Sequence, residues 1–152
     1  MNTDLANADP ADLILRPGCR EDAAGIHELI QPFVAKSLLL DRSVEEIQRL
    51  TAASVAAEYR DELIGFAAVE IYSQKLSEIQ CLVVKEGFHQ LGVGKKLVAR
   101  CVEIARENGI IELMAISSSV AFLKSCGFDY SLPGQKRALF IDPSAEGKST
   151  EH

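Results

Sequence analysis

Two spacings of hydrophobic residues recur along the chain, and together they predict a mixture of helices and strands. Apolar residues stand every three or four positions at Ile26, Ile30 and Phe33, and again at Leu97 and Cys101, which is the pattern of a helix with one buried face. Runs that are continuously apolar, or that alternate with polar residues, predict strands. The predicted helices are residues 23–33, 43–50, 92–108 and 119–125, and the predicted strands are residues 13–15, 54–59, 63–72, 77–84, 110–116, 128–130 and 138–141.

Local signals mark several ends of these elements. Ser43 and Glu46 have the spacing of a capping box, so a helix is expected to begin there. Pro32 is expected to kink or end the first helix, and Gly109 is expected to cap the long helix before it. The predicted order is therefore strand, two helices, three strands, helix, strand, helix and two strands.

Composition and charge narrow the class of protein. The chain has 152 residues, of which 47% are hydrophobic and 25% charged, as expected for one folded domain. We expect that domain at residues 12–142, with disordered tails at residues 1–11 and 143–152, where small, polar and charged residues dominate. The net charge of −6 argues against nucleic acid or an anionic membrane as the partner.

Neither a secretion signal nor a metal centre is predicted. The N-terminus lacks a basic start and an apolar segment, and no stretch has the roughly 20 apolar residues that span a bilayer, so a cytoplasmic location is expected. The four cysteines are widely spaced and contain no C-x-x-C pair, which predicts neither a disulfide framework nor a zinc site.

The most informative segment is the apolar run 81–84 followed by a turn and a basic helix. Gly92 and Gly94 allow the backbone to approach a ligand, and the helix N-terminus that follows presents free N–H groups and a positive dipole end. This combination predicts a phosphate site. Lys96 after Gly94-Lys95 leaves no hydroxyl for magnesium, which excludes a Walker A loop, and Leu97 stands where a dinucleotide fingerprint needs its third glycine.

The segment resembles the pyrophosphate loop of the GNAT acetyltransferases, Q/R-x-x-G-x-G/A between a strand and a helix. His89 stands where that family usually carries Gln or Arg. Residues 122–128 are similar to a second family motif, F-[YF]-x-x-x-G-F, with Leu123 at the position where many members have a proton-donating tyrosine. The resemblance implies an α/β (α+β) GNAT fold, with a mixed twisted sheet of six to seven strands and helices on both faces. It also implies that acetyl-CoA, as co-substrate, is bound by Cys81, Leu82, Val83, Val84, His89, Gln90, Leu91, Gly92, Val93, Gly94, Lys95, Phe122 and Lys124.

Within that superfamily the chain most resembles the acetyltransferase domain of N-acetylglutamate synthase. Residues 38–47, 77–84, 119–122 with 127–128, and 132–133 carry this likeness. It implies that Glu78 is the general base, that Ser119 is the general acid, and that Arg42 binds the carboxylate of an amino-acid acceptor.

The residue patterns alone leave other roles open for these three side chains. Strand alternation places Glu78 on the same face as Gln80 and Leu82, opposite Ile79 and Cys81, but a solvated strand-end carboxylate would also fit. Ser119 could simply cap a helix, and Arg42 could be an exposed arginine at a helix entry. A base, an oxyanion donor and an acid are the groups that acetyl transfer to an amine requires.

The expected function is transfer of an acetyl group from acetyl-CoA to the α-amine of a small amino acid. Glutamate is the first candidate, which would connect the enzyme to arginine biosynthesis. The alternatives are acetylation of another small amine or of a protein N-terminus, and a non-catalytic acetyl-CoA-binding module. The expected partner is a small-molecule amine, with neither nucleic acid nor membrane, and a homodimer is one option for assembly.

Overall fold

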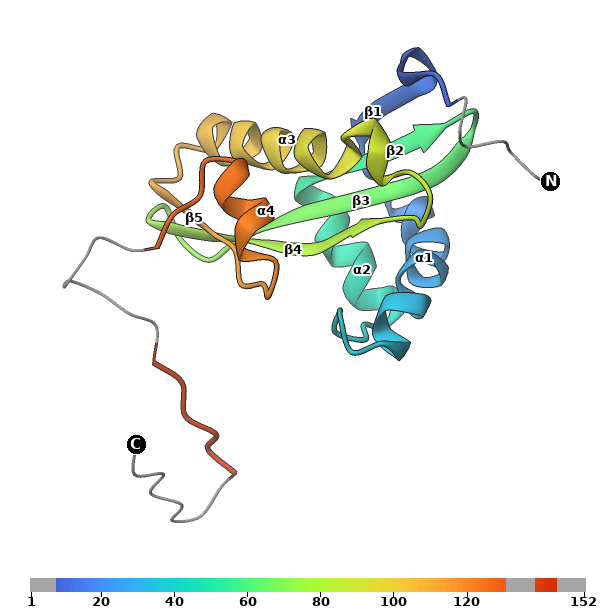
Figure 1. Ribbon diagram of the computed structural model, residues 1–152. Helices are drawn as coiled ribbons and strands as arrows, with labels where there is room; N and C mark the ends of the chain where they lie inside the picture. Colours follow the sequence, from blue (N-terminus) through green and yellow to red (C-terminus); the bar gives the residue numbers. More distant parts are fainter. Residues whose placement is uncertain (1–7, 131–138, 145–152) are drawn as a thin grey trace.

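The computed structural model describes residues 8–130 and 139–144 and contains one mixed β-sheet with helices on both faces (Figure 1). The strands follow one another in the sheet in chain order. The first three pairings are antiparallel and the last is parallel. The strands are β1 (Leu13–Pro17), β2 (Ser54–Tyr59), β3 (Glu62–Ile71), β4 (Leu76–Val84) and β5 (Glu112–Met114).

Five strands form in the described residues, where six to seven were predicted. Phe128 donates its amide to the carbonyl of Leu123 at 3.1 Å, so this segment continues the turn that ends a helix rather than joining the sheet. Residues 139–141 have no strand partner and are between 81% and 91% exposed, and residue 138 lies outside the described part. An apolar run becomes a strand only when a neighbouring strand supplies its hydrogen bonds.

The helices are α1 (Ala23–Ala35), α2 (Val44–Leu50), α3 (Val93–Glu107) and α4 (Val120–Ser125). The Ser43 hydroxyl accepts a hydrogen bond from the amide of Glu46 at 3.1 Å, which confirms the predicted start of α2. Pro32 lies inside α1, which continues three residues past it. In the described part of the chain, no helix has both the length and the apolar character needed to cross a membrane.

Each face of the sheet carries its own hydrophobic core. α3 packs on one face and α1 with α2 on the other (Figure 1). The α3 core is centred on Val93, Leu97 and Cys101, and the α1–α2 core on Ile26, Ile30, Ile47 and Phe66, all of which are almost completely buried. This division gives the sheet two chemically separate faces.

A β-bulge in β4 changes the face to which its side chains point. In the pairing with β3, Phe66 lies opposite Val83 and Ala68 opposite Gln80, so Cys81 and Leu82 together face one residue. Cys81 has a φ of 57°, in the left-handed region. Ile79 and Leu82 pack on the α3 side, whereas Cys81 packs on the α1–α2 side. Strand alternation was therefore wrong beyond Gln80, because it assumed an unbroken pleat.

Candidate functional site

The loop after β4 leads into α3 through a single left-handed residue. Gly92 has a φ of 68°, and a Cβ added there would meet nothing within 4 Å, so the glycine provides backbone conformation rather than space. The amide of Lys96 donates to the carbonyl of Gly92 at 3.2 Å as the first bond of the helix. Helix geometry therefore leaves the preceding amides, those of residues 93–95, directed out of the N-terminal end.

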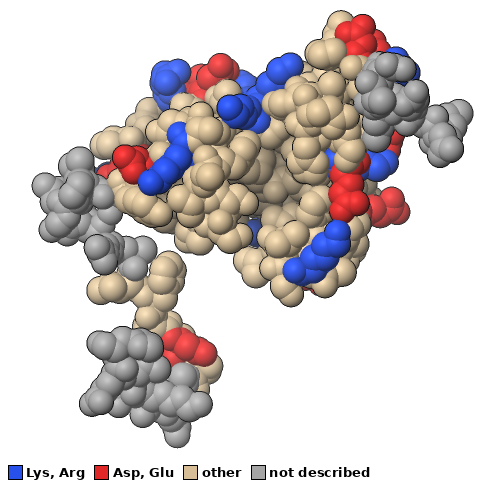
Figure 2. All heavy atoms as spheres, viewed as in Figure 1, with Lys and Arg blue, Asp and Glu red and all other residues tan. Residues whose placement is uncertain are grey.

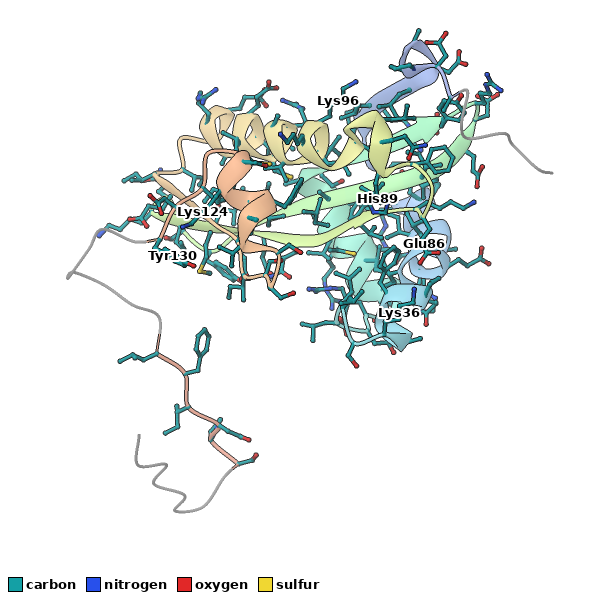
Figure 3. The ribbon with its side chains drawn as sticks, viewed as in Figure 1. Lys36, Glu86, His89, Lys96, Lys124 and Tyr130 are labelled. Carbon is teal, nitrogen blue, oxygen red and sulfur yellow. The ribbon has the colours of Figure 1, made fainter. Side chains whose placement is uncertain are left out.

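Gly94 has a different role, because it makes room for α4. A Cβ added at Gly94 would lie 3.2 Å from Cζ of Phe122. This close approach brings the second sequence motif against the first turn of α3. The ammonium of Lys124, also predicted to bind acetyl-CoA, lies 4.6 Å from the ring centre of Tyr130 (Figure 3).

Five of the side chains predicted to bind acetyl-CoA are buried in the protein core and are not available to a ligand. Those of Cys81, Val83, Val84, Leu91 and Val93 are at most 9% exposed and belong to the two cores. Any ligand at these positions would meet main-chain atoms. His89 and Gln90, by contrast, lie in the exposed turn between β4 and α3 (Figure 3).

The edge of β4 toward β5 provides such main-chain atoms. The parallel pairing ends at Glu78 opposite Met114, although β4 continues for six more residues to Val84. Within the described residues, this part of the edge has no strand partner. Figure 2 shows the centre of this face of the molecule hollowed and lined mainly by uncharged atoms. Free strand-edge groups and the α3 N-terminus together could bind an acyl amide chain that ends in a pyrophosphate.

Polar side chains on the α1–α2 side form a continuous hydrogen-bonded chain. Arg42, which precedes α2, donates through Nη2 to Oε1 of Gln80 on β4. Nε2 of Gln80 lies 3.5 Å from the Tyr72 hydroxyl, and that hydroxyl donates to Oε1 of Glu78 at 2.8 Å. Partial burial and the hydrogen bond to Glu78 raise the pKa of Tyr72 to about 12. Arg42 and Glu78, which lie 36 positions apart in the sequence, are thus joined through two residues.

Glu70 completes this group of residues, which we call the Arg42–Glu78 network (Arg42, Glu70, Tyr72, Glu78 and Gln80). Glu70 lies directly opposite Glu78 in the pairing of β3 with β4, and its Oε2 is 3.3 Å from the Tyr72 hydroxyl. Sequence reasoning identified Arg42 and Glu78 but missed roles for Tyr72 and Glu70. Their positions depend on the register of the hairpin, which the sequence pattern does not specify.

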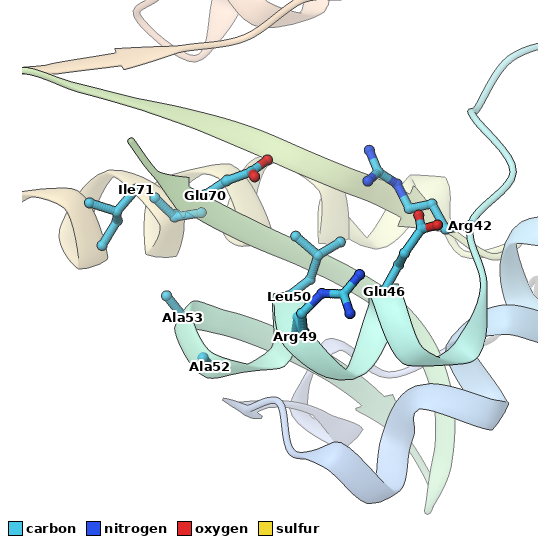
Figure 4. A pocket seen from close by; sticks show the side chains of 9 residues that line it. Arg42, Glu46, Arg49, Leu50, Ala52, Ala53, Glu70 and Ile71 are labelled. Atoms are coloured by element: carbon cyan, nitrogen blue, oxygen red, sulfur yellow. The ribbon is translucent and has the colours of Figure 1, made fainter. Parts of the chain in front are cut away.

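A pocket of about 500 Å³ adjoins the network between α2 and the end of β3 (Figure 4). It carries two guanidinium groups and two carboxylates as well as apolar atoms. Gln80 is the one hydrogen-bond partner of Arg42 among the described residues, so most of its donors are available to a ligand. The lining residues are Arg42, Glu46, Arg49, Leu50, Ala52, Ala53, Val69, Glu70 and Ile71.

Ser119 stands apart from the network. It is exposed, precedes α4, and donates its amide to the Ser117 hydroxyl at 2.9 Å. Its own hydroxyl makes no capping bond, so the helix-capping alternative is not realised by this side chain. No hydrogen bond in the described part of the chain connects Ser119 with Glu78 or Arg42.

Comparison with known proteins matches these features to one family. Residues 23–128 match the model of the acetyltransferase (GNAT) family. An N-acetyltransferase of Chlorobaculum tepidum is 30% identical over 118 residues, covering 78% of this chain and 76% of the relative. The amino-acid acetyltransferase of Photorhabdus laumondii is 30% identical over 125 residues, and this chain spans only 28% of its length.

Solved structures show the same fold. The N-acetylglutamate synthase of Neisseria gonorrhoeae, complexed with coenzyme A and N-acetyl-glutamate, superposes with a TM-score of 0.68 at 28% identity, over 74% of this chain and 27% of that one. The Mycobacterium tuberculosis protein Rv2747, in complex with coenzyme A, gives a TM-score of 0.70 at 20% identity over 75% of this chain and 70% of that one. The chain therefore belongs to the GNAT acetyltransferase family, and it is an N-acetyltransferase with acetyl-CoA as its co-substrate.

Proposed function

We propose that the acceptor is the α-amine of a small amino acid, with glutamate as the leading candidate. The observation that carries this proposal is the position of Arg42. Its guanidinium lines the pocket, and most of its N–H groups have no hydrogen-bond partner among the described residues. A guanidinium binds a carboxylate through two parallel hydrogen bonds, which a simple amine cannot accept. Arg49 adds a second positive charge to the same lining, as a dicarboxylic acceptor would require.

Relatives support the same acceptor class. The name of the Photorhabdus laumondii relative specifies an amino acid, and the Neisseria gonorrhoeae structure contains N-acetyl-glutamate. Because this chain spans less than a third of either protein, we take their substrates as support for a proposal about residues 12–142, the proposed acetyltransferase domain.

The residues of this chain would divide the work between the two faces of the sheet. Acetyl-CoA supplies the acetyl thioester. The main chain around Leu82 and the first-turn amides of α3 would bind it, since they have no partners within the sheet or helix. On the other face, Arg42 would orient the acceptor, and Glu78 would take the ammonium proton through Oε2, directly or through a water. Ser119 is the proposed proton donor to the leaving thiolate.

A second acceptor class is a small basic amine. The observation in its favour is that two carboxylates, those of Glu46 and Glu70, also line the pocket. They would attract a cationic substrate as Arg42 and Arg49 would attract an anionic one.

A thiol-release assay with acetyl-CoA separates these classes. The twenty amino acids, together with simple amines of matched length such as putrescine, are offered as acceptors at equal concentration. We expect turnover to be highest with glutamate and to fall when the α-carboxylate is removed. Equal turnover with simple amines would refute the amino-acid assignment and leave acetyl transfer itself intact.

A further inference from the structure

The hydrogen-bonded chain from Arg42 to Glu78 has a fixed direction. A guanidinium carries donors and no acceptor, so the Gln80 atom that faces Arg42 must be the amide oxygen. The amide nitrogen of Gln80 then faces Tyr72, to whose oxygen it can only donate, across a long contact of 3.5 Å. The Tyr72 proton is consequently directed away from Gln80 and toward a carboxylate.

Glu78 is the carboxylate that accepts the hydrogen bond from the Tyr72 hydroxyl. Its Oε1 lies 2.8 Å from the Tyr72 hydroxyl, whereas Oε2 of Glu70 lies 3.3 Å away. A hydroxyl has one proton, so the shorter contact is the stronger bond. The charged groups facing the hydroxyl are Glu78 from β4, Glu70 from β3 and, through Gln80, Arg42 at the start of α2.

The bond restricts a side chain that would otherwise be mobile. Holding a glutamate side chain in one conformation has one of the largest entropy costs of any residue. Because Glu78 is only half-buried, packing alone does not fix its carboxylate. Tyr72 directly follows the last residue of β3, and a tyrosine with two side-chain dihedral angles has fewer conformations than a glutamate. The Tyr72 hydroxyl donates to Oε1 of Glu78, so Oε2 remains available to accept a proton.

We propose that Tyr72 is a positioning residue, which holds Glu78 for proton transfer and, through Gln80, couples it to the carboxylate-binding Arg42. This inference rests on the proposed function, since it assigns the base and the acceptor group to Glu78 and Arg42. Tyr72 itself need not touch the acceptor. Its effect is on the orientation of the Glu78 carboxylate, to which its hydroxyl donates.

The test removes one hydroxyl. In Tyr72→Phe we expect kcat to fall about 10-fold, a part of the contribution of a general base, with the KM of acetyl-CoA unchanged. The matched control is Tyr59→Phe, which removes a hydroxyl on β2 that accepts a hydrogen bond from the amide of Asp9. It should leave both kcat and the KM of acetyl-CoA unchanged.

A second variant tests the coupling. Gln80→Leu keeps the Tyr72–Glu78 bond and removes the link to Arg42, so it should lower turnover with amino acids more than turnover with simple amines. A wild-type kcat in Tyr72→Phe would overturn the inference. If Glu78→Gln is inactive in that same assay, the positioning role alone has failed, whereas if wild type and Glu78→Gln have equal rates the proposed base has failed as well.

Discussion

The ring of Phe122 lies where a side chain on Gly94 would have to go, with Cζ 3.2 Å from the position of the missing Cβ. Phe122 belongs to α4 and Gly94 to the first turn of α3, so the two family motifs approach each other closely at this point. The two glycines of the loop are therefore under different constraints. Gly92 requires a left-handed backbone, and Gly94 requires space.

A valine at position 94 is expected to weaken acetyl-CoA binding and to lower the melting temperature together. Its branched side chain would collide with Phe122 and displace α4 from the loop. Isothermal titration calorimetry with coenzyme A and thermal unfolding would measure the two effects. An unchanged affinity in Gly94→Val would remove the proposed ligand site from this loop.

Comparing Gly92→Ala with Gly109→Ala should separate the effect of backbone strain on stability from the effect of the loop on coenzyme A binding. Gly109 is the matched control, because it also has a φ of 68° with nothing within 4 Å of an added Cβ, at the opposite end of α3. Each alanine should cost about 1 kcal/mol of stability, since the left-handed region disfavours a side chain. Only Gly92→Ala should weaken coenzyme A binding. Equal affinities in the two variants would argue against a ligand at the N-terminus of α3.

Arg42→Ala is expected to raise the KM for a glutamate acceptor about 10- to 100-fold, which corresponds to the loss of charge-assisted hydrogen bonds. Arg42→Lys should restore the charge but not the two parallel bonds, and so recover only part of the loss. Steady-state kinetics at saturating acetyl-CoA would measure this, with the KM of acetyl-CoA as the internal control. Similar KM values in all three proteins would show that the carboxylate binds elsewhere.

Glu78→Gln should lower kcat on the order of 10²- to 10⁴-fold while leaving coenzyme A affinity close to that of wild type. The amide keeps the shape and can still accept from Tyr72, but it cannot take a proton. Glu70→Gln is the matched comparison on the neighbouring strand, and it should retain a larger share of the rate. If Glu70→Gln were the more damaging change, the base would have to be reassigned to the carboxylate that lines the pocket.

Stability should depend on pH through Asp22, which joins the turn before α1 to β1. The two terminal guanidinium nitrogens of Arg16 donate to its carboxylate, at 2.8 and 2.7 Å, and these hydrogen bonds are the main reason why the pKa of Asp22 is lowered to about 2. Because the pKa of Asp22 is lower in the folded protein than in the unfolded chain, its charged carboxylate stabilises the fold above pH 4. This stabilisation is lost as the pH falls toward 2.

The stability advantage of wild type over Asp22→Asn should therefore shrink by about 2 kcal/mol between pH 6 and pH 2, as urea unfolding would show. Glu107→Gln serves as the control, because its pair with Arg100 is exposed and should contribute little at either pH. A difference between wild type and Asp22→Asn that did not change with pH would contradict the assignment of this pair.

The helices and the β2–β3 hairpin were predictable because their signals are local. Apolar spacing, the Ser43 cap and Gly109 lie within or beside the elements that they define. The predicted strand at 128–130 depended instead on a partner elsewhere in the chain, and Phe128 is tied to α4. The loop at residues 89–94 was recognisable for the same reason as the helices, since its glycines and the following helix are adjacent in sequence.

The Arg42–Glu78 network was only half predictable. Arg42 and Glu78 stood out by family resemblance, but the connecting residues Tyr72 and Gln80 meet through the β3–β4 register. At these residues the register is set by the turn between Ile71 and Leu76, which leaves no trace in the hydrophobic pattern. The extra residue at Cys81 lies on the far side of Gln80 from that turn and shifts only the pairs beyond it. The lesson applies to hairpins generally, in which one inserted residue reassigns every neighbour beyond it.

The extra residue in β4 also separates two kinds of evolutionary change. Before it, Glu78 and Gln80 present polar side chains on the proposed acceptor side, and after it the strand offers mainly backbone. Under the proposed function, substitutions in the first half are expected to change the acceptor preference and to leave the backbone edge of the second half in place. Deleting Cys81 would restore an unbroken pleat in which Leu82, Val83 and Val84 keep their present faces, because Leu82 on the α3 side would then follow Gln80 directly. What the deletion would remove is the buried Cys81 side chain from the α1–α2 core.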